Sequence, residues 1–261
     1  MITYHQTQNK EAIYWHESSL LTVPHAMLCR SGGVSQEQFA SLNLSYTVGD
    51  KKESVRKNRA RVKQLFPLNH LVSCVQVHGD RIVAVENIEK DTVFPDADAL
   101  MTNQPGIGLL IQQADCQAIL FHDPIQKAIG AAHSGWKGSV LDIAGQTVSA
   151  MRKKYGSNPA DIRAVISPSL GPCCAEFLNA SRELPDSFFT HQAAENYFDF
   201  WAISRKQLQK AGLVRDNIEI AGLCTACGDN FFSYRRAKKQ GSDHTGRNGS
   251  ILCLPSREKT T

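Results

Sequence analysis

Three strand-length apolar runs follow one another closely in the middle of this chain, and they limit the folds that it can adopt. The runs span residues 106–112, 117–121 and 128–132. Short apolar runs bounded by polar or turn-forming residues predict buried strands rather than helices. Because the connections between the runs are short, we expect the three strands to be neighbours in one sheet.

The surrounding sequence mixes predicted strands with predicted helices. Residues 71–77 and 81–85 predict a β-hairpin with a tight turn at residues 78–80. The apolar spacing of residues 53–66 predicts an amphipathic helix that Pro67 ends. Further helices are predicted at residues 140–151 and 203–211, and further strands at residues 164–167 and 218–222. Hairpins together with packed helices favour an α+β fold, with mixed sheets and helices on the outside.

Length, composition and charge narrow the class of protein. The chain has 261 residues, of which 42% are hydrophobic, and no linker-like stretch divides it, so we expect a single domain over residues 1–261. A net charge of +4, spread over 29 basic and 25 acidic residues, gives no indication of a nucleic-acid partner. Neither a signal sequence nor an apolar run of about 18 residues is present, which predicts a cytoplasmic protein without a membrane partner. The sequence indicates no particular protein partner.

Two histidines and one cysteine lie at predicted boundaries between strands and loops. His78 follows one predicted strand, Cys116 precedes another, and His133 ends a third. Strand ends are rigid supports for functional side chains. Two imidazoles and one thiolate with an open coordination position are typical of a catalytic zinc site, so we predict a metal centre at these three residues. The alternative is that the histidines cap strands and that the cysteine is a small buried side chain.

The chain has eight cysteines, and four of them form two local pairs. Cys173 and Cys174 are adjacent, whereas Cys224 and Cys227 form a C-x-x-C pair. A four-cysteine structural zinc site and a redox pair are both possible interpretations. We favour neither, because adjacent cysteines are expected to point in divergent directions and no zinc-knuckle loop or thioredoxin-type strand and helix surrounds the second pair. The role of these four cysteines stays open.

Several short motifs, in order along the chain, resemble those of one known family. They are RSGGVS (30–35), SLNLSYTVGD (41–50), NR (58–59), QVHG (76–79), DADAL (96–100), ADC (114–116), AAHSGWKG (131–138), LGPCCAEF (170–177), FFSYRR (231–236) and TGRNGSIL (245–252). The chain resembles the laccase-domain proteins, also called YfiH-like or multicopper polyphenol oxidase-like, which include purine nucleoside phosphorylases. The resemblance implies a layered α/β/β/α fold.

The same resemblance implies a site and an activity. The family's zinc ligands fall on His78, Cys116 and His133, with copper as an alternative metal. The activity it implies is zinc-dependent phosphorolysis of adenosine, inosine, guanosine and methylthioadenosine to free base and ribose 1-phosphate, with adenosine deaminase side activity. Departures from the family pattern at Ser45, Thr47, Gln117, Ser134 and Lys137 remove no metal ligand.

Phosphorolysis needs cations that hold phosphate beneath the ribose, and the planar fork of arginine suits that task. We expect catalytic roles for Asp115, Arg30 and Lys137. In deamination, Asp115 would carry a proton or orient the attacking water. The expected substrate-binding residues are Asn43, Arg235, Arg236 and Arg247. The partners would be a small-molecule nucleoside and phosphate.

Two other function classes stay open. The first is a copper-dependent polyphenol oxidase, although coupled multicopper oxidation needs about ten histidines in paired motifs. This chain has nine histidines, and none of them lies in such a pair. The second is a zinc or cysteine amidase that edits a peptidoglycan precursor. In that class, metal binding and nucleophilic attack would compete for the sulfur of Cys116.

Overall fold

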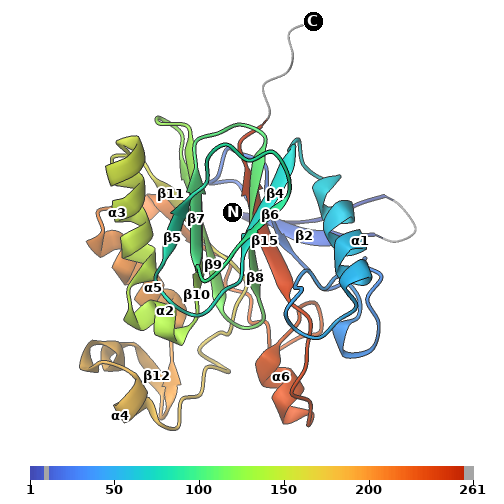
Figure 1. The fold of residues 1–261 in the computed structure, drawn as a ribbon. Helices are drawn as coiled ribbons and strands as arrows, with labels where there is room; N and C mark the ends of the chain where they lie inside the picture. Colours follow the sequence, from blue (N-terminus) through green and yellow to red (C-terminus); the bar gives the residue numbers. More distant parts are fainter. Residues whose placement is uncertain (9–11, 256–261) are drawn as a thin grey trace, which may run out of the picture.

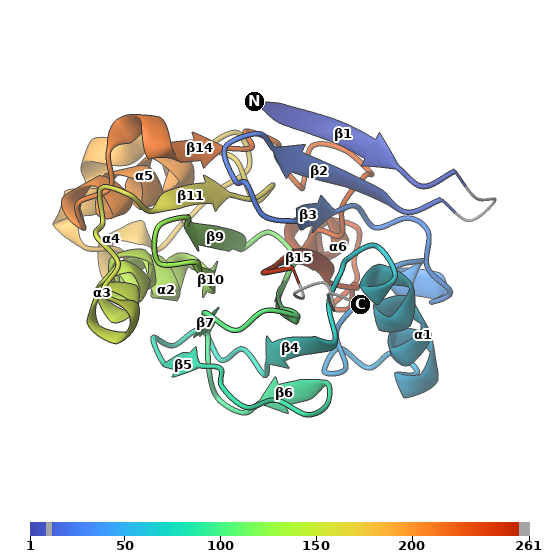
Figure 2. The same cartoon turned by 90° about the horizontal axis from the view of Figure 1, so that it is seen from above.

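Two β-sheets pack face to face, with helices on their outer faces (Figures 1 and 2). The computed structural model describes residues 1–8 and 12–255. This arrangement confirms the predicted α+β class and the α/β/β/α layers. Within the described residues, no helix has the length and apolar character needed to cross a membrane.

The first sheet is mixed. Its strands, in spatial order, are β1 (Ile2–Gln6), β2 (Tyr14–Ser18), β3 (His25–Leu28), β15 (Asn248–Cys253), β8 (Ile107–Gln113), β4 (His70–Cys74) and β6 (Thr92–Phe94). The pairs from β1 to β8 are antiparallel, whereas β4 runs parallel to both β8 and β6.

The second sheet is also mixed and carries two of the predicted metal ligands. Its strands, in spatial order, are β14 (Ile218–Ile220), β11 (Arg163–Ile166), β9 (Gln117–Asp123), β10 (Ala128–Ser134), β7 (Ala99–Thr102) and β5 (Ile82–Ala84). The central pairs are antiparallel, and each edge strand runs parallel to its neighbour. A separate short pair, β12 (Gln192–Ala194) and β13 (Tyr197–Phe198), lies beyond this sheet.

The main hydrophobic core fills the space between the two sheets. Leu109 and Leu252 from the first sheet are buried against Leu120 and Ala131 from the second. Every residue of β8, β9 and β10 is buried, because a second layer covers the other face of each sheet. Burial on both faces explains why these strands are continuous apolar runs rather than alternating ones.

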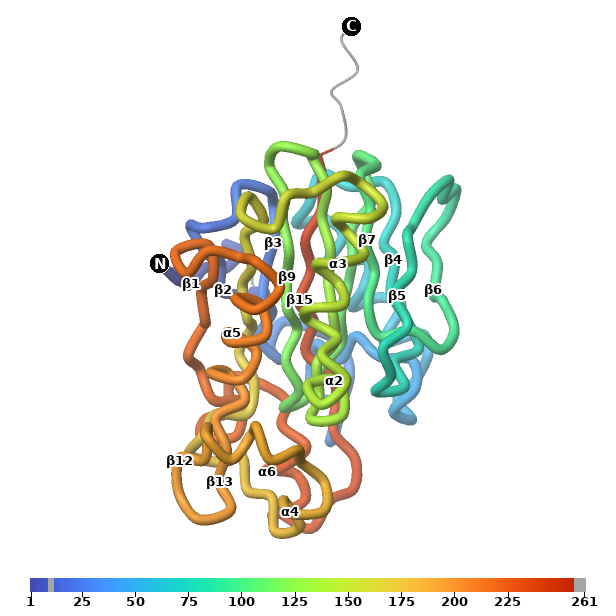
Figure 3. The backbone as a smooth tube through the Cα atoms, turned by 90° about the vertical axis from the view of Figure 1, so that its left-hand side faces the viewer, coloured from blue at the N-terminus to red at the C-terminus, as the bar shows by residue number. Residues whose placement is uncertain are grey.

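Helices cover the outer faces. On the second sheet lie α2 (Trp136–Val140), α3 (Ile143–Tyr155) and α5 (Phe200–Lys210), which stand in front of the strands in Figure 3. On the first sheet lies α1 (Lys52–Lys63), whose buried Val62 joins a cluster with strand residues of that sheet. At the lower end of Figure 3 lie α4 (Ala180–Glu183) and α6 (Tyr234–Lys239). Short 3₁₀ helices span Glu37–Phe39, Asp186–His191 and Arg215–Asn217.

Two predictions about strand pairing are wrong. The predicted hairpin does not form, because β4 belongs to the first sheet and β5 to the second. The segment between them, residues 75–81, crosses from one sheet to the other. Likewise, β9 and β10 pair, but β8 lies in the other sheet. An apolar run that is buried on both faces looks the same in either sheet, so its sequence cannot show which sheet it joins.

The remaining element predictions are confirmed with shifted ends. The amphipathic helix is α1, the predicted helix over residues 140–151 falls on α3, and that over 203–211 falls on α5. Asp142 begins α3 by accepting a hydrogen bond from the Gly145 N–H at 3.1 Å, as an N-cap residue does.

Asn58 on α1 holds the segment that follows β3. It is fully buried, and its Oδ1 accepts a hydrogen bond from the Val34 N–H at 2.8 Å. Its Nδ2 donates to Ser35 Oγ at 3.0 Å, to Ser41 O at 3.1 Å and to Asn43 O at 2.9 Å. One side chain thus satisfies four polar groups of the segment over residues 34–43.

Asn58→Asp keeps the size of this side chain but turns its donor into an acceptor that faces two carbonyl oxygens. We expect the free energy of unfolding to fall by roughly 3 kcal/mol, because buried polar groups lose their partners. Urea denaturation measures this change. The neighbouring exposed Lys57→Gln is the control, with an expected change within about 0.5 kcal/mol. Equal stability of the two variants would contradict the role of Asn58.

Candidate metal centre and its cavities

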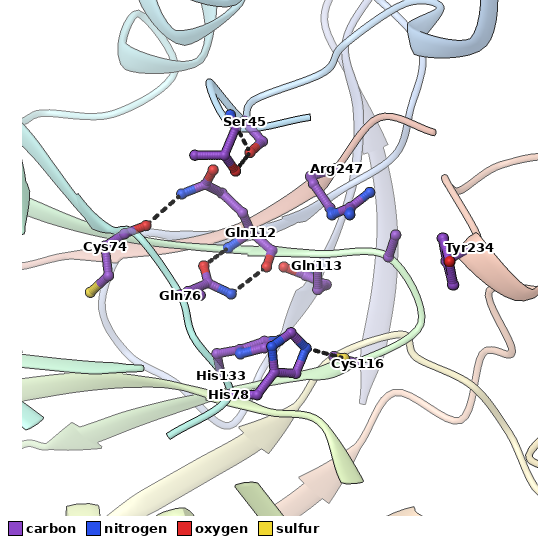
Figure 4. A pocket seen from close by; sticks show the side chains of 12 residues that line it. Ser45, Cys74, Gln76, His78, Gln112, Gln113, Cys116, His133, Tyr234 and Arg247 are labelled. Carbon is purple, nitrogen blue, oxygen red and sulfur yellow. Dashed lines mark hydrogen bonds between the residues drawn. The ribbon is translucent and has the colours of Figure 1, made fainter. Parts of the chain in front are cut away.

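The three predicted metal ligands lie together. His78 is on the crossover segment between the sheets, Cys116 directly precedes β9, and His133 lies within β10. Their ligand atoms are all within 4.8 Å of one another. The Cys116 Sγ lies 3.9 Å from His78 Nε2, and the two imidazole ring centroids are 4.8 Å apart. Figure 4 shows both imidazoles beside the cysteine sulfur at one side of a cavity.

This ligand set fits a zinc ion with an open position. Bonds to zinc are about 2.3 Å long for sulfur and about 2.0 Å long for nitrogen. In a tetrahedral site, a sulfur ligand and a nitrogen ligand therefore lie roughly 3.6 Å apart. The observed separation of 3.9 Å between Cys116 Sγ and His78 Nε2 is close to that value. Among the described residues, the group contains two histidines and one cysteine, which leaves a fourth position for water or substrate.

Asp98 holds both histidines in place. It is fully buried, and its Oδ1 lies 2.8 Å from His133 Nδ1. The same carboxylate accepts backbone hydrogen bonds from Val77 at 3.1 Å, His78 at 3.0 Å and Gly79 at 2.8 Å. Because Asp98 accepts the proton of Nδ1, the Nε2 atom of His133 is left to face the metal position.

The sequence interpretation gave Asp98 no role, although it lies in the DADAL motif at residues 96–100. Burial raises the pKa of this carboxyl, but the hydrogen bond to His133 and the backbone N–H groups lower it further, so that the net pKa lies below its ordinary value. Asp98 is therefore ionised. An acidic residue between two alanines, just before a buried strand, is the signal that could have identified it.

Gly135 allows the ligands to approach the backbone closely. A Cβ atom at this position would lie 2.9 Å from Cys116 Sγ and 3.0 Å from His78 Cδ2. Both distances are too short for an added methyl group without displacing a ligand. The glycine of the AAHSGWKG motif is therefore required by the space around the ligands.

The electrostatics of the site favour a thiolate. Burial raises the pKa of Cys116, but the positive charge of His133 and hydrogen bonds to both imidazoles outweigh it and lower the pKa well below the ordinary value. Burial lowers the pKa of His133, but the Cys116 thiolate and Asp98 together raise it above the ordinary value. A thiolate is the form of cysteine that binds metal ions and attacks electrophiles.

Two cavities share His78 and Cys116 in their walls, and His133 lines the first of them. The first has a volume of about 410 Å³ and is lined mainly by polar side chains (Figure 4). Its lining residues are Ser45, Thr47, Cys74, Gln76, His78, Gln112, Gln113, Ala114, Cys116, His133, Tyr234 and Arg247.

The second cavity has a volume of about 290 Å³ and includes several aromatic side chains. Its lining residues are His78, Ala114, Asp115, Cys116, Gln117, Ser134, Gly135, Trp136, Leu170, Phe177, Phe200, Tyr234 and Arg235. We call them the polar cavity and the aromatic cavity.

Besides the three predicted metal ligands, three of the predicted catalytic and substrate-binding residues line these cavities. Arg247 lines the polar cavity, and its Nη1 donates to the carbonyl of Thr245 at 2.9 Å. Asp115 and Arg235 line the aromatic cavity. Both oxygens of Asp115 accept hydrogen bonds, from Thr225 Oγ1 at 2.7 Å and from the Arg235 N–H at 2.6 Å. Asp115 therefore connects the Cys116 segment to two other segments.

Arg30 and Arg236, with predicted phosphate and substrate roles, are not among the residues that line the polar or the aromatic cavity. The Nε and Nη2 atoms of Arg30 both donate to the carbonyl of Ala40, at 2.9 and 2.7 Å. Arg236 donates to the carbonyls of Thr225, at 2.8 Å, and Phe231. Both guanidinium groups bind backbone carbonyls of loops.

Asn43 and Lys137 also lie outside the two cavity linings. Asn43 is fully buried and donates to Ser45 O at 3.1 Å and to Asp50 Oδ2 at 2.9 Å. Lys137 is exposed, and its Nζ lies 5.5 Å from the ring centroid of Trp136. It lines neither cavity.

The hydrogen bonds of Asp98 predict the effect of its replacement. Asp98→Asn keeps the shape but places an N–H₂ group against backbone N–H donors or the His133 ring. We expect zinc affinity to fall about 10- to 100-fold, as is typical when a carboxylate that orients a histidine ligand is replaced. Competition with a chelator measures this affinity. The exposed Asp96→Asn in the same motif is the matched control and should bind zinc like the wild type. Equal affinities of the two variants would contradict the role of Asp98.

The chain matches known proteins over most of its length. A family model described as multi-copper polyphenol oxidoreductase laccase matches residues 24–255. Purine nucleoside phosphorylase YlmD of Bacillus subtilis (strain 168) is 34% identical over 240 residues, which cover 85% of this chain and 85% of YlmD.

Two solved structures have the same fold. The crystal structure of YlmD from Geobacillus stearothermophilus has a TM-score of 0.85 at 29% identity and covers 96% of this chain and 99% of its own. That of the Bacillus licheniformis hypothetical protein YfiH has a TM-score of 0.84 at 32% identity and covers 95% of this chain and 98% of its own. On sequence and structure together, the chain belongs to the multi-copper polyphenol oxidoreductase laccase family.

Proposed function

We propose that this protein is a zinc-dependent purine nucleoside phosphorylase that uses His78, Cys116 and His133 as metal ligands. One observation carries the proposal: the ligand group lies where a polar cavity with an arginine meets a cavity with aromatic walls. A nucleoside and a phosphate ion together match these two cavities. The flat base corresponds to the aromatic cavity, and the sugar with the phosphate anion corresponds to the polar cavity. The relatives named purine nucleoside phosphorylase support the same activity.

The aromatic cavity suits the purine base. Trp136, Phe177 and Phe200 contribute ring surfaces, and Leu170 contributes an aliphatic one. Such walls bind a flat heteroaromatic ring by stacking and by removing apolar surface from water. We propose that the base of adenosine, inosine, guanosine or methylthioadenosine binds there.

The polar cavity suits ribose and phosphate. Arg247 supplies a permanent positive charge, and its backbone N–H donates to the buried Asn43 Oδ1 at 2.9 Å, which fixes its segment. Gln76 is held rigidly, because its amide donates to Gln112 O at 2.7 Å and accepts from the Gln112 N–H at 2.9 Å. Fixed donors of this kind orient a substrate without reorganising during the reaction.

In phosphorolysis, a phosphate oxygen forms a bond to ribose C1′ while the bond from C1′ to the purine nitrogen breaks. The purine leaves with the bonding electrons and takes up a proton, and ribose 1-phosphate remains. When bound, zinc supplies a Lewis acid beside the reacting ring. We assign Arg247 to hold the phosphate and Asp98 to keep His133 in the tautomer that binds metal.

Adenosine deamination is proposed as a side activity of the same centre. In that reaction, a water oxygen bonds to C6 of the purine and the bond from C6 to the amino group breaks. One proton of the water goes to the amino group, which leaves as ammonia, and the other stays on the ring of the product inosine. Asp115 lies on the wall of the aromatic cavity, next to Cys116, and is the carboxylate that we assign to move the proton.

The family's description names a multicopper oxidase, but the ligand groups of this chain favour another chemistry. Among the described residues, the group that contains histidine offers two imidazoles and one thiolate. Coupled multicopper oxidation requires several copper ions and about ten histidines. The distribution of ligands therefore favours a single zinc at this site.

Phosphate dependence distinguishes phosphorolysis from hydrolysis. With inosine or adenosine as substrate, we expect ribose 1-phosphate to form only when phosphate is supplied, because phosphate is the nucleophile at C1′. Chromatography of the sugar products in buffers with and without phosphate measures this. Free ribose that accumulates equally fast without phosphate would exclude the phosphorylase and indicate a hydrolase.

A pair of arginine variants tests the assignment of the phosphate site. Arg247→Ala should raise the phosphate concentration needed for half-maximal rate by about 10- to 100-fold, through the loss of roughly 1.5 to 3 kcal/mol of charged hydrogen bonding. Deamination should decrease much less, because it uses no phosphate. Arg30→Ala is the matched control: it should lower the melting temperature but leave the phosphate requirement unchanged. Equal loss of both activities in Arg247→Ala would contradict the assignment.

A further inference from the structure

Four cysteines form a second group of possible metal ligands, apart from the group just described. The sulfur atoms of Cys173, Cys174, Cys224 and Cys227 all lie within 4.8 Å of one another. The expectation that the adjacent pair diverges is therefore wrong. The Sγ atoms of Cys173 and Cys227 are 3.3 Å apart, and those of Cys174 and Cys227 are 3.6 Å apart.

These separations resemble those of a tetrathiolate metal site. Zinc–sulfur bonds of about 2.3 Å place the sulfurs of a tetrahedral site roughly 3.8 Å apart. A disulfide needs about 2.05 Å between sulfurs, and all four cysteines are free thiols in the structure. Four sulfurs that meet around one point can satisfy a closed tetrahedral site, in contrast to the open site at His78, Cys116 and His133.

The backbone brings the two pairs together. Strands β11 and β14 are parallel neighbours, and the segments that follow them continue side by side. The Ser169 N–H donates to Leu223 O at 3.1 Å, and the Thr225 N–H donates to Ser169 O at 3.0 Å. The Cys224 sulfur therefore lies beside the turn that carries Cys173 and Cys174.

A turn at Gly171 directs the adjacent cysteines toward the other pair. The Cys174 N–H donates to Gly171 O at 2.9 Å, which reverses the chain. The Gly171 N–H donates to Cys224 Sγ at 3.3 Å, a contact that stabilises a thiolate. A Cβ atom on Gly171 would lie 2.8 Å from the ring of Trp201, so the turn requires glycine.

We propose that Cys173, Cys174, Cys224 and Cys227 bind a structural zinc ion. A tetrahedral arrangement of four thiolates selects zinc or iron among common metals, and a closed site with no open position serves the fold rather than the reaction. Arg236 holds the loop that carries Cys227. Its Nη1 donates to the carbonyls of Thr225, at 2.8 Å, and Gly228, on either side of Cys227.

This second site supports the first. Thr225, which follows Cys224, donates to Asp115 Oδ1 at 2.7 Å, and Asp115 precedes the ligand Cys116. The Leu170 N–H donates to Asp115 O at 2.8 Å, and Leu170 lines the aromatic cavity. A zinc ion at the cysteines would therefore fix the wall of the cavity that we assign to the base.

Metal analysis of the intact protein tests this proposal separately from the proposed function. We expect two zinc ions per chain after purification under reducing conditions without added metal, and one in the Cys116→Ala variant, which leaves the four cysteines untouched. Exchange of that remaining ion for cobalt should give the intense absorption of a tetrathiolate complex. If Cys116→Ala loses phosphorolysis but retains one zinc, the loss reports on the site at His78, Cys116 and His133, and the retained zinc supports the four-cysteine site.

A second variant addresses the cysteines directly. Cys227 is exposed, so Cys227→Ser removes a ligand without opening the core, and we expect it to lose one zinc and to melt at a lower temperature. The buried Cys253→Ala is the control and should retain both ions. The proposal is overturned if Cys116→Ala contains no zinc, if the metal is iron, or if mass spectrometry finds the four cysteines joined in disulfides.

Discussion

The carboxylate of Asp98 is the interaction on which the site depends. It stands at the start of β7 in the second sheet, yet three of its hydrogen bonds come from the segment that has just left the first sheet. The fourth partner is the ring of His133 on the neighbouring strand β10. One buried anion therefore sets the path of the crossover that carries His78 and the orientation of the His133 imidazole. A buried charge is stable only with such a complete set of partners, so the crossover and the site form together.

The site lies where the chain passes between sheets. The connection from β4 to β5 carries His78, and the connection from β8 to β9 carries Cys116. Each connection leaves one sheet and enters the other. Polar backbone in such a connection needs partners, which Asp98 supplies to His78 and its neighbours. Gln76, on the same connection, bonds the backbone of Gln112 near the end of β8. His78 and Cys116 thus lie on short segments that are held at both ends by strands, whereas His133 lies within a strand.

The sequence predicted most of the elements and the three residues that the structure brings together as a possible metal site, but not what surrounds them. His78, Cys116 and His133 could be identified because metal ligands must be histidine, cysteine or acid, and few such residues adjoin apolar runs. Arg30 and Arg247 could not be separated, since both lie beside glycines. Only the folded chain shows that the first binds the carbonyl of Ala40 and that the second lines a cavity. The four-cysteine group was considered but not favoured, because the direction of adjacent side chains depends on a turn that the local sequence does not specify.

The close approach of Gly135 to the predicted ligands limits the directions from which a metal ion or a substrate can reach them. The Gly135 backbone lies against the Cys116 sulfur and the His78 ring, and the His133 residue is 3% exposed. Protein atoms therefore cover one side of the ligand group. The polar and aromatic cavities form its open side. In the enzyme that we propose, metal exchange and substrate entry would therefore use the same opening. A molecule that fills the cavities would then block the path by which a bound ion leaves.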